Sequence, residues 1–585
     1  MTASKFFTKK AFRFLLAIFL ISIAWIAYVL FEDYQNWLTA TPQDTPMEIR
    51  IRNGILLIVG LAALAYGAVI SISHLNGTAG AGNKVPDSAA PSASAANQSF
   101  EDKMLSLVGP QYVLEVRGLG SFVGNHGNSE IWMKFDQVGN SHQSIISKNP
   151  QDYPWDSSSR FDNLRIAIAI AFRDAAGKTV ERWPIPVISW GPPKHELCDF
   201  RAAYEIAAAR QAASLGIHLL LWEEDANVED GTELIQRLFA FFDKNPDAPG
   251  IIVLSTDGDI ARFGNGEPGS GSMKNGYYAP DMPDSVTAMW VTRTDRVNQL
   301  IRPFAVKQPE GVNKNHAQYD IIKLWNFFWE KNDNRGPENF NAYYLEHYRR
   351  PGSTTTLTPG FMTSAWWHQQ LPTLWKQITN AGPGLFKPSP YLPIRWTDWQ
   401  LKQFDSAPVV GYLHRPIDIK LTDEQGKPLD RLIRRERLQQ GWQQAMATLP
   451  DGERPKRIFY DSTLGGTKWV GHLNQAFQQI DPAAPDMTED KEGFDLGVRI
   501  GSMGVSGPGM QLALGIIAGY HFGGPSATVH LRPNGDAMMM MVSPMGEKTK
   551  AAWVQTYGRM DPFGSEYPPD KSASPQNPDT PQETR

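Results

Sequence analysis

The chain has 585 residues, which is enough for two or three domains with hydrophobic cores of their own. Its formal net charge of −5 leaves no basic excess, so we expect no nucleic acid among its partners. Cys198 is the only cysteine, which excludes an intrachain disulfide and any zinc site built on paired cysteines.

Two uncharged apolar runs lie near the start of the chain, at 14–31 and 54–72. Each is close to the roughly 20 residues that a helix needs to cross a bilayer. A cleaved signal peptide is the alternative for the first run, but its apolar core is too long and no clean small-x-small cleavage site follows it. The sequence therefore predicts two N-terminal transmembrane helices, and we assign residues 1–73 to a two-span membrane anchor.

Basic residues set the expected orientation of this anchor. A basic cluster between Lys5 and Arg13 precedes the first run, and a basic N-terminus tends to stay in the cytoplasm. Arg50 and Arg52 lie in the loop between the two runs and oppose this orientation. On balance we predict a multi-pass membrane protein whose soluble body is returned to the cytoplasm by the second span.

Composition divides the rest of the chain. Residues 74–100 are rich in Gly, Ala, Ser, Asn and Pro, which cannot bury enough apolar surface to order themselves and predict a flexible linker. The C-terminal part, 546–585, is assigned to a disordered tail for the same reason. Between them we expect a first α/β half at 101–310, an aromatic-rich insert at 311–400 and a second α/β half at 401–545.

Strand and helix patterns alternate in the first half. A strand that follows a helix that follows a strand implies parallel pairing through right-handed crossovers, which is the α/β class. The expected strands are 111–116, 166–173, 185–190, 217–222 and 251–255, and the expected helices are 200–215 and 232–242.

The second half repeats this order. A glycine-rich stretch at 499–509 precedes an apolar helix, and Asn534-Gly535 is a strong hairpin signal. Both halves resemble parts of a thiolase-like fold, so we expect a duplicated fold of that kind. The expected helices are 434–448, 468–480 and 510–520, and the expected strands are 457–461, 527–531 and 537–542.

A rigid corner follows the strand at 185–190, because Gly191-Pro192-Pro193 forbids both a helix and a strand ladder. Ligands of α/β folds lie beyond the C-terminal ends of strands, where Ser189, Lys194 and His195 are expected. A solvated corner explains the same residues, and we prefer that interpretation.

Two short motifs approach known catalytic or cofactor patterns. The stretch 264–269 matches the dinucleotide glycine pattern, but it does not lie directly between a strand and a helix, and Pro268 interrupts it. Ser506 approaches the hydrolase elbow, but Pro508 stands where the second glycine belongs. We therefore expect neither a cofactor nor a serine nucleophile.

Acidic residues gather at the ends of two strands that we expect to be neighbours. Oxygen-rich clusters bind Mg²⁺ or Ca²⁺, so a metal at this edge is one interpretation. Solvated strand ends explain the residues without one, and we assign no metal ligand while the alternative stays open. The residues are Glu223, Glu224, Asp225, Asp257 and Asp259.

In a thiolase-like enzyme a cysteine thiolate attacks with help from histidines, and the nucleophile is carried by the helix between the third and fourth strands. Cys198 precedes the first helix instead, and Asp199 beside it opposes a thiolate. His472 and His521 lie near glycines in the second half, but neither has a cysteine to work with. We assign no catalytic residue.

Tryptophans are concentrated between His316 and Trp399, at 325, 329, 366, 367, 375, 396 and 399. Trp325, Phe328 and Trp329 share one helical stripe, which is more often core packing than a partner surface. Trp366 and Trp367 are adjacent, so on a helix they diverge by about 100° and can hardly face one core. We predict that this pair binds a partner protein.

Five stretches resemble the type VI lipase adapter family, over roughly residues 110–545. The most specific is 183–195, Trp-Pro-Ile-Pro-Val-Ile-Ser-Trp-Gly-Pro-Pro-Lys-His. The shorter ones are 116–120, 149–154, 209–211 and 221–227. The family is associated with type VI secretion in Gram-negative bacteria, so the predicted anchor would lie in the inner membrane.

This resemblance implies a non-catalytic adapter with no cofactor. Its expected partners are a phospholipase effector and the valine-glycine repeat spike protein onto which the effector is loaded. The alternative, from another functional class, is a membrane-tethered thiolase-like acyl-transfer or condensing enzyme. A histidine within hydrogen-bond reach of Cys198 in one pocket would favour the enzyme, whereas a Cys198 remote from any pocket and beside an exposed aromatic patch would favour the adapter.

Overall fold

The structure is a computed structural model, and it describes residues 104, 111–139, 143–192, 201–227, 230–264, 273–309, 311–312, 315–333, 362–557 and 562–563. Both predicted membrane spans, the predicted linker, Lys194, His195 and Cys198 lie outside these residues. Among the helices that are described, none combines the length and the apolar character needed to cross a bilayer.

A twelve-stranded mixed sheet runs through the described body, in the order β10-β9-β11-β12-β7-β1-β6-β5-β3-β4, with β2 added to β1 and β8 to β12. In the first half, β3 is parallel to β4 and β5, whereas β6 is antiparallel to both β1 and β5. The bounds are β1 Leu114–Val123, β3 Pro184–Gly191, β4 Leu219–Asn227, β5 Gly250–Asp257 and β6 Ser285–Thr292, with the short β2 at His126–Gly127 and β8 at Ile417–Ile419.

The second half repeats this topology. Counted along the chain without the short β2 and β8, each half places its five strands in the order third, second, fourth, fifth, first. In each half the fifth strand is antiparallel to its neighbours. The bounds are β7 Gly411–Leu413, β9 Arg457–Tyr460, β10 Gly493–Asp495, β11 Ser526–Leu531 and β12 Ala537–Pro544. The two halves join edge to edge through the antiparallel pair β1 and β7. The α/β class and the duplication expected from the sequence are therefore present in the sheet itself.

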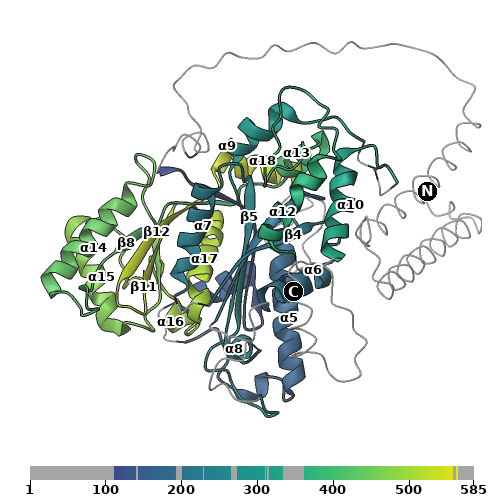
Figure 1. Ribbon diagram of the computed structural model, residues 1–585. Helices are drawn as coiled ribbons and strands as arrows, with labels where there is room; N and C mark the ends of the chain where they lie inside the picture. The colour runs from purple at the N-terminus through teal and green to yellow at the C-terminus, as the bar shows by residue number, and fades with distance from the viewer. Residues whose placement is uncertain are drawn as a thin grey trace, which may run out of the picture. The chain divides into compact units, whose positions relative to one another are not determined.

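Equivalent helices follow equivalent strands. In the first half these are α5 Ser157–Ala176, α6 Arg201–Ala212 and α7 Thr232–Lys244, and in the second α14 Arg431–Met446, α15 Gly466–Ile480 and α17 Gly507–Phe522. In Figure 1, α14 and α15 cover one side of the second half, α5 and α6 lie at the first half, and α7 and α17 run beside each other in the middle. One core cluster draws on both halves, including Phe239 of α7 and Leu514 of α17.

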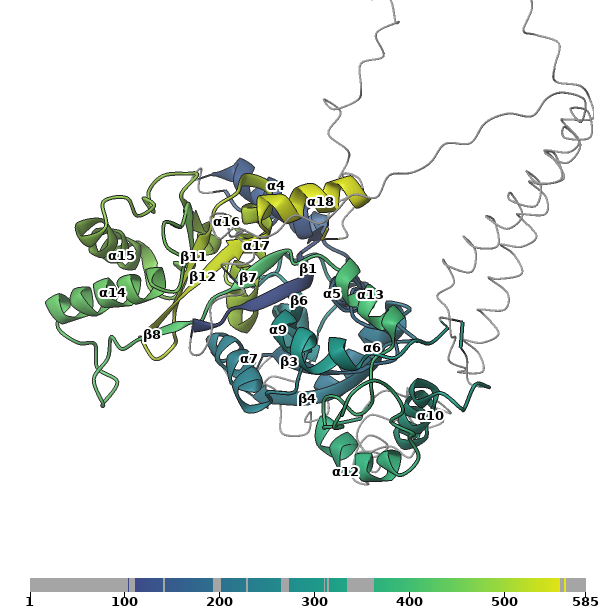
Figure 2. The same cartoon turned by 90° about the horizontal axis from the view of Figure 1, so that it is seen from above.

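The remaining helices fill loops and the insert. They are α4 Asn128–Val138, α8 Asp259–Gly264, α9 Thr294–Arg296, α10 Asp320–Asp333, α12 Ser364–Trp375, α13 Asp398–Ser406, α16 Leu496–Arg499 and α18 Glu547–Tyr557, with the single turns η2 Pro150–Asp152, η4 Val297–Ile301, η5 Arg302–Phe304 and η6 Gly504–Ser506. Figure 2 shows α10 and α12 together, away from α14 and α15.

Two expectations about elements were wrong. Residues 166–173 belong to helix α5, because Leu164, Ile168 and Ala175 are buried at helical spacing while Ile166 is 53% exposed. The segment 546–585 begins with helix α18, whose Lys and Ala residues favour a helix, and the part from 564 onward lies outside the described residues.

Two glycines in β1 allow this strand to pack closely against helix α5. A Cβ on Gly120 would lie 2.0 Å from the carbonyl oxygen of Ala171, and one on Gly118 would lie 2.4 Å from that of Ala175. Strand β1 therefore touches helix α5 backbone to backbone. Both glycines belong to the 116–120 stretch that carried part of the family resemblance, so that stretch has a packing role.

Candidate functional site

The aromatic insert covers part of one edge of the sheet, at β4. Strand β4 is the last strand in the sheet order, and the amide of Trp222 donates to the carbonyl of Met362 over 2.9 Å. Trp222 also forms a parallel bridge with Thr363, whose hydroxyl accepts from the amide of Trp366 and begins helix α12. Because an unpaired strand edge is a template for unwanted pairing, this cover protects β4 along the part it reaches.

Trp367 lies in the core of the insert. Its side chain is 0% exposed, and its ring centroid lies 5.8 Å from that of Phe327 and 5.7 Å from that of Phe328, both on α10. Two of the three stripe residues on α10 belong to the core as well, because Trp325 is 6% exposed and Phe328 is 1% exposed, while Trp329 is half-buried. The prediction that Trp367 anchors a partner does not fit this burial, because the side chain lies on the face of α12 that packs against α10.

Trp366 points away from that core. It is half-buried, and its indole Nε1 is enclosed without a hydrogen-bond acceptor among the described residues. The two adjacent tryptophans thus diverge, as the helix geometry required, and Trp366 remains a partner-binding prediction.

The acidic cluster is divided by the sheet. Strand β3 lies between β4 and β5, so the expected neighbours are not adjacent and Glu223 is separated from Asp257. Glu223 instead meets the insert, where the Tyr391 hydroxyl donates to its Oε1 over 3.1 Å, and burial raises the pKa of Glu223. Across the described part of the chain, no three His, Cys, Asp or Glu side chains are placed to hold a metal ion.

Asp257 ties the two halves together. It is completely buried, its Oδ1 accepts from Nε of Arg262 over 2.8 Å, and its Oδ2 accepts from the amide of Val505 over 2.8 Å. A Cβ on Gly504 would lie 1.9 Å from that Oδ2, so the glycine admits the carboxylate. Asp257 is therefore a structural anchor for the turn that precedes α17.

The start of α7 is the position at which a thiolase-like enzyme would carry its cysteine, because α7 connects the third and fourth strands of its half. Here a Cβ on Gly231 would lie 2.0 Å from the carbonyl oxygen of Val505. Arg532 donates from Nε to the hydroxyl of Thr232 over 2.8 Å and pairs with Asp230 at 3.4 Å. Backbone and a paired guanidinium thus occupy the surroundings of this helix start.

Ser506 is also enclosed in this junction. It is 0% exposed, and its hydroxyl donates to the carbonyl of Met503 over 2.8 Å and contacts the hydroxyl of Ser285. It lies in the turn η6 rather than after a strand, so it does not form a hydrolase elbow. His472 and His521 lie on two different helices, α15 and α17.

The other two sequence candidates have structural surroundings of their own. Gly264 ends helix α8, which is not the strand-to-helix turn that a dinucleotide needs, and 265–269 lie outside the described residues. Ser189 is 2% exposed within β3, so it is not presented at the corner.

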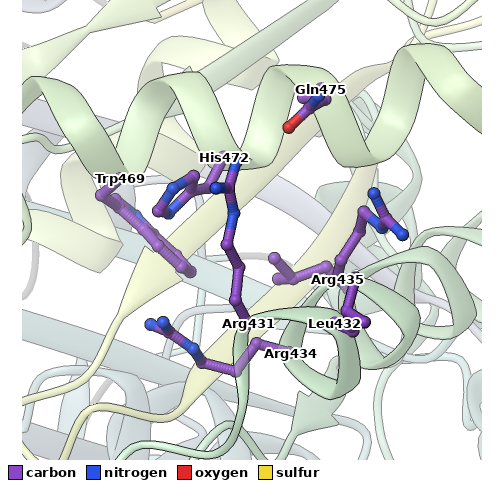
Figure 3. Close-up of a pocket in the computed structure, with 8 residues that line it drawn as sticks. Arg431, Leu432, Arg434, Arg435, Trp469, His472 and Gln475 are labelled. Carbon is purple, nitrogen blue, oxygen red and sulfur yellow. The ribbon is translucent and has the colours of Figure 1, made fainter.

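A hollow between α14 and α15 is a feature that our sequence analysis missed. Its lining residues are Arg431, Leu432, Arg434, Arg435, Leu438, Trp469, His472 and Gln475 (Figure 3). The sequence carried only the α14 part of this signal, because basic residues three and four positions apart lie on one face of a helix.

Comparison with protein families gives two matches. Residues 112–275 match the family described as type VI lipase adapter protein Tla3, N-terminal, and residues 410–544 match its C-terminal counterpart. The chain belongs to the type VI lipase adapter family. The family resemblance noted in the sequence is confirmed, and the two matches fall on the two α/β halves. The insert, with Trp366, lies outside both matched ranges.

Among solved structures, this adapter-family chain is similar to condensing enzymes at very low identity. The ishigamide ketosynthase/chain length factor is 10% identical, with 74% of this chain and 100% of that chain covered and a TM-score of 0.38. 3-oxoacyl-(acyl carrier protein) synthase III from Pseudomonas aeruginosa PAO1 is 10% identical, with 74% of this chain and 99% of that chain covered and a TM-score of 0.31. A module 1 ketosynthase from Bacillus amyloliquefaciens FZB42 is 9% identical, with 74% of this chain and 73% of that chain covered and a TM-score of 0.37. The duplication of the fold is seen in the strand order of this chain itself.

Proposed function

We propose that this chain is a non-catalytic adapter that binds a phospholipase effector and loads it onto the valine-glycine repeat spike protein of a type VI secretion system. The observation that carries the proposal is the family match across both α/β halves. Adapters of this kind need a surface that holds the cargo and a second contact with the spike, and they need no reacting group.

The junction between the two halves supports the non-catalytic part of this proposal. An acyl-transfer enzyme needs a nucleophile that a substrate can reach. At the start of α7, Gly231 touches the backbone of Val505, and Arg532 is engaged with Thr232 and Asp230. The chain has no second cysteine that could serve there in place of Cys198. These features favour the adapter over the condensing enzyme.

Affinity purification of the full-length protein from its native host, followed by mass spectrometry, tests the proposal. We expect a phospholipase and a valine-glycine repeat spike protein among the captured proteins. Deleting the lipase gene should lower the recovery of the spike if the adapter recognises the loaded cargo. Recovery of neither protein would contradict the proposal, as would accumulation of an acyl product that depends on this chain.

A further inference from the structure

The hollow between α14 and α15 has a cationic rim. In Figure 3 the Arg431 side chain extends from α14 toward His472 on α15, and the side chains of Arg434 and Arg435 flank it. Among the described residues, none of these three arginines has an acidic side chain in ion-pair distance. Nε of Arg434 is enclosed without a hydrogen-bond acceptor in the same part of the chain. An enclosed guanidinium N–H that lacks an acceptor is costly, and a bound carboxylate removes that cost.

The position of these arginines in α14 makes binding of an anion more favourable. They lie in the first turns of the helix, where the N-terminus already carries partial positive charge, and the first turn holds no acidic residue. The acidic residues at this end of α14 are the N-cap Asp430, which accepts from the amide of Leu432, and the exposed Glu436. Lys468 adds another cation at the start of α15.

The pKa of His472 responds to the positive charge of the arginines. Burial lowers its pKa, and Arg431 and Arg434 lower it further because they repel the imidazolium form. An occupant with carboxylates between these residues would reverse the repulsion and raise the pKa of His472.

The floor of the hollow is apolar. Leu438 is 2% exposed and Trp469 is 8% exposed, while Leu432 at the rim is 57% exposed. Arginine and tryptophan around a small apolar depression are typical of anchor pockets in protein interfaces. The hollow is concave, which suits a protruding peptide side chain better than the flat surface of a membrane.

We propose that this hollow is the docking site for an acidic segment of the effector, in which an apolar side chain enters between Leu438 and Trp469 and flanking carboxylates pair with the arginines. The occupant must be acidic because the rim is cationic, in a chain whose net charge is −5. This assignment rests on the proposed function and names the cargo contact within it.

The test compares two double variants with equal charge change. Arg431→Glu/Arg435→Glu reverses the rim. The control, Lys427→Glu/Arg437→Glu, reverses two exposed cations that do not line the hollow. The rim variant should fold at least as well as the wild type, because acidic residues near a helix N-terminus are favourable. Circular dichroism and the melting temperature check this.

In lipase capture from the native host, the rim variant should lose about tenfold or more in affinity, while the control keeps capture. A lipase variant with the matching acidic residues changed to Lys should bind the rim variant again. In the wild type, peptides from the acidic segments of the captured lipase should raise the pKa of His472 in ¹H–¹⁵N NMR titrations.

Distinct outcomes separate the two proposals. If the wild type captures the lipase and the rim variant captures it equally, the docking site is wrong and the adapter function stands. If the wild type captures no lipase, both fail. The docking site is also overturned if inorganic phosphate or phosphatidylglycerol vesicles shift His472 while the lipase peptides do not, or if the rim variant changes only self-association of the chain.

Discussion

Three histidines, His218, His414 and His530, are enclosed by protein and held neutral. Burial lowers the pKa of each from the ordinary 6.5, to about 3 for His218 and His530 and about 4 for His414. His414 makes two hydrogen bonds that fix its neutral ring, to the carbonyl of Thr448 over 2.8 Å and to the hydroxyl of Ser543 over 2.7 Å. In the neutral ring Nδ1 donates to the Thr448 carbonyl, and Nε2 accepts from the Ser543 hydroxyl. Protonation of Nε2 would remove that acceptor.

These histidines predict a pH dependence of stability. Because the pKa of each histidine is lower in the folded state, the unfolded chain binds the proton first as the pH falls. The contribution of these histidines to the free energy of unfolding is therefore fully present above pH 6.5 and is lost as the pH drops toward 4. Each histidine contributes up to about 1.4 kcal/mol per pH unit to this slope. Burial raises the pKa of Asp284 to about 7, which acts in the opposite direction over part of the same range.

Replacing His414 isolates one contribution. His414→Gln removes a titrating group, so the free energy of unfolding from urea titrations should vary less between pH 6.5 and 4.5 than in the wild type, although it is lower at neutral pH. An unchanged slope would mean that His414 takes up its proton within the folded protein.

Cys198→Ala tests the enzyme alternative directly. A lone cysteine is most simply a small apolar residue, and Asp199 beside it disfavours the thiolate. We expect the variant to capture the same lipase at native protein levels. Complete loss of function in a normally folded Cys198→Ala protein would support a catalytic thiol.

The two neighbouring tryptophans should respond differently to truncation. Trp367→Ala opens a cavity against Phe327 and Phe328 and should cost about 3–5 kcal/mol of stability. Trp366→Ala should leave the melting temperature nearer to the wild-type value but lower cargo affinity about thirtyfold, or about 2 kcal/mol. Melting temperature and lipase capture should be measured on both variants. If Trp366→Ala captures the lipase as well as the wild type does, Trp366 is not part of the docking surface.

At the level of single residues, sequence reasoning was limited by its lack of spatial neighbours. The spacing of Trp366 and Trp367 correctly required them to diverge, but only α10 decides which of them is buried. The acidic cluster failed for a related reason, because chain order placed β4 beside β5 while the sheet puts β3 between them. The cationic hollow needed both α14 and α15, which no single stretch reveals.

The contact between β1 and α5 is the element-level feature most sensitive to change. Gly120→Ala would place a methyl group 2.0 Å from the Ala171 carbonyl oxygen, so strand and helix would have to separate. We expect a loss of about 1–3 kcal/mol or more in the free energy of unfolding.

Gly471→Ala is the matched control for this substitution. Gly471 is an exposed residue inside helix α15, with no atom within 4 Å of a built Cβ. Alanine there should stabilise by about 0.5–1 kcal/mol. Equal effects of the two substitutions in urea unfolding would show that β1 and α5 are not packed backbone to backbone.

Most elements of the two halves were predictable because their apolar periods are long and are bounded by Gly and Pro. The exception, 166–173, alternates Ile and Ala in a way that also suits a strand. Its helical identity depends on a wider window that begins at Asp156, whose carboxylate accepts from the amide of Ser159 and caps α5.

For the whole molecule, the membrane topology remains a prediction from the two apolar runs and the basic N-terminus. We propose that the body faces the cytoplasm, where effectors are made. A reporter enzyme fused after Arg585 should be active only if it functions in the cytoplasm. Activity of alkaline phosphatase, which works only in the periplasm, at that position would reverse the assignment.

The pairing of β1 with β7 also has a consequence during synthesis. Strand β1 is complete early and gains β6 as a partner once Thr292 has emerged. On its second edge β2 pairs only at Phe122 and Val123, so the part from Leu114 to Val116 stays open until Gly411 follows. Roughly 120 residues separate these points, which at bacterial translation speeds leaves that part of the edge unpaired for about 6–24 s. During this interval the ribosome makes the insert, which covers β4 and not β1. The nascent chain is therefore most exposed to aggregation just before its second half appears, and a trigger-factor-like holdase would matter most there.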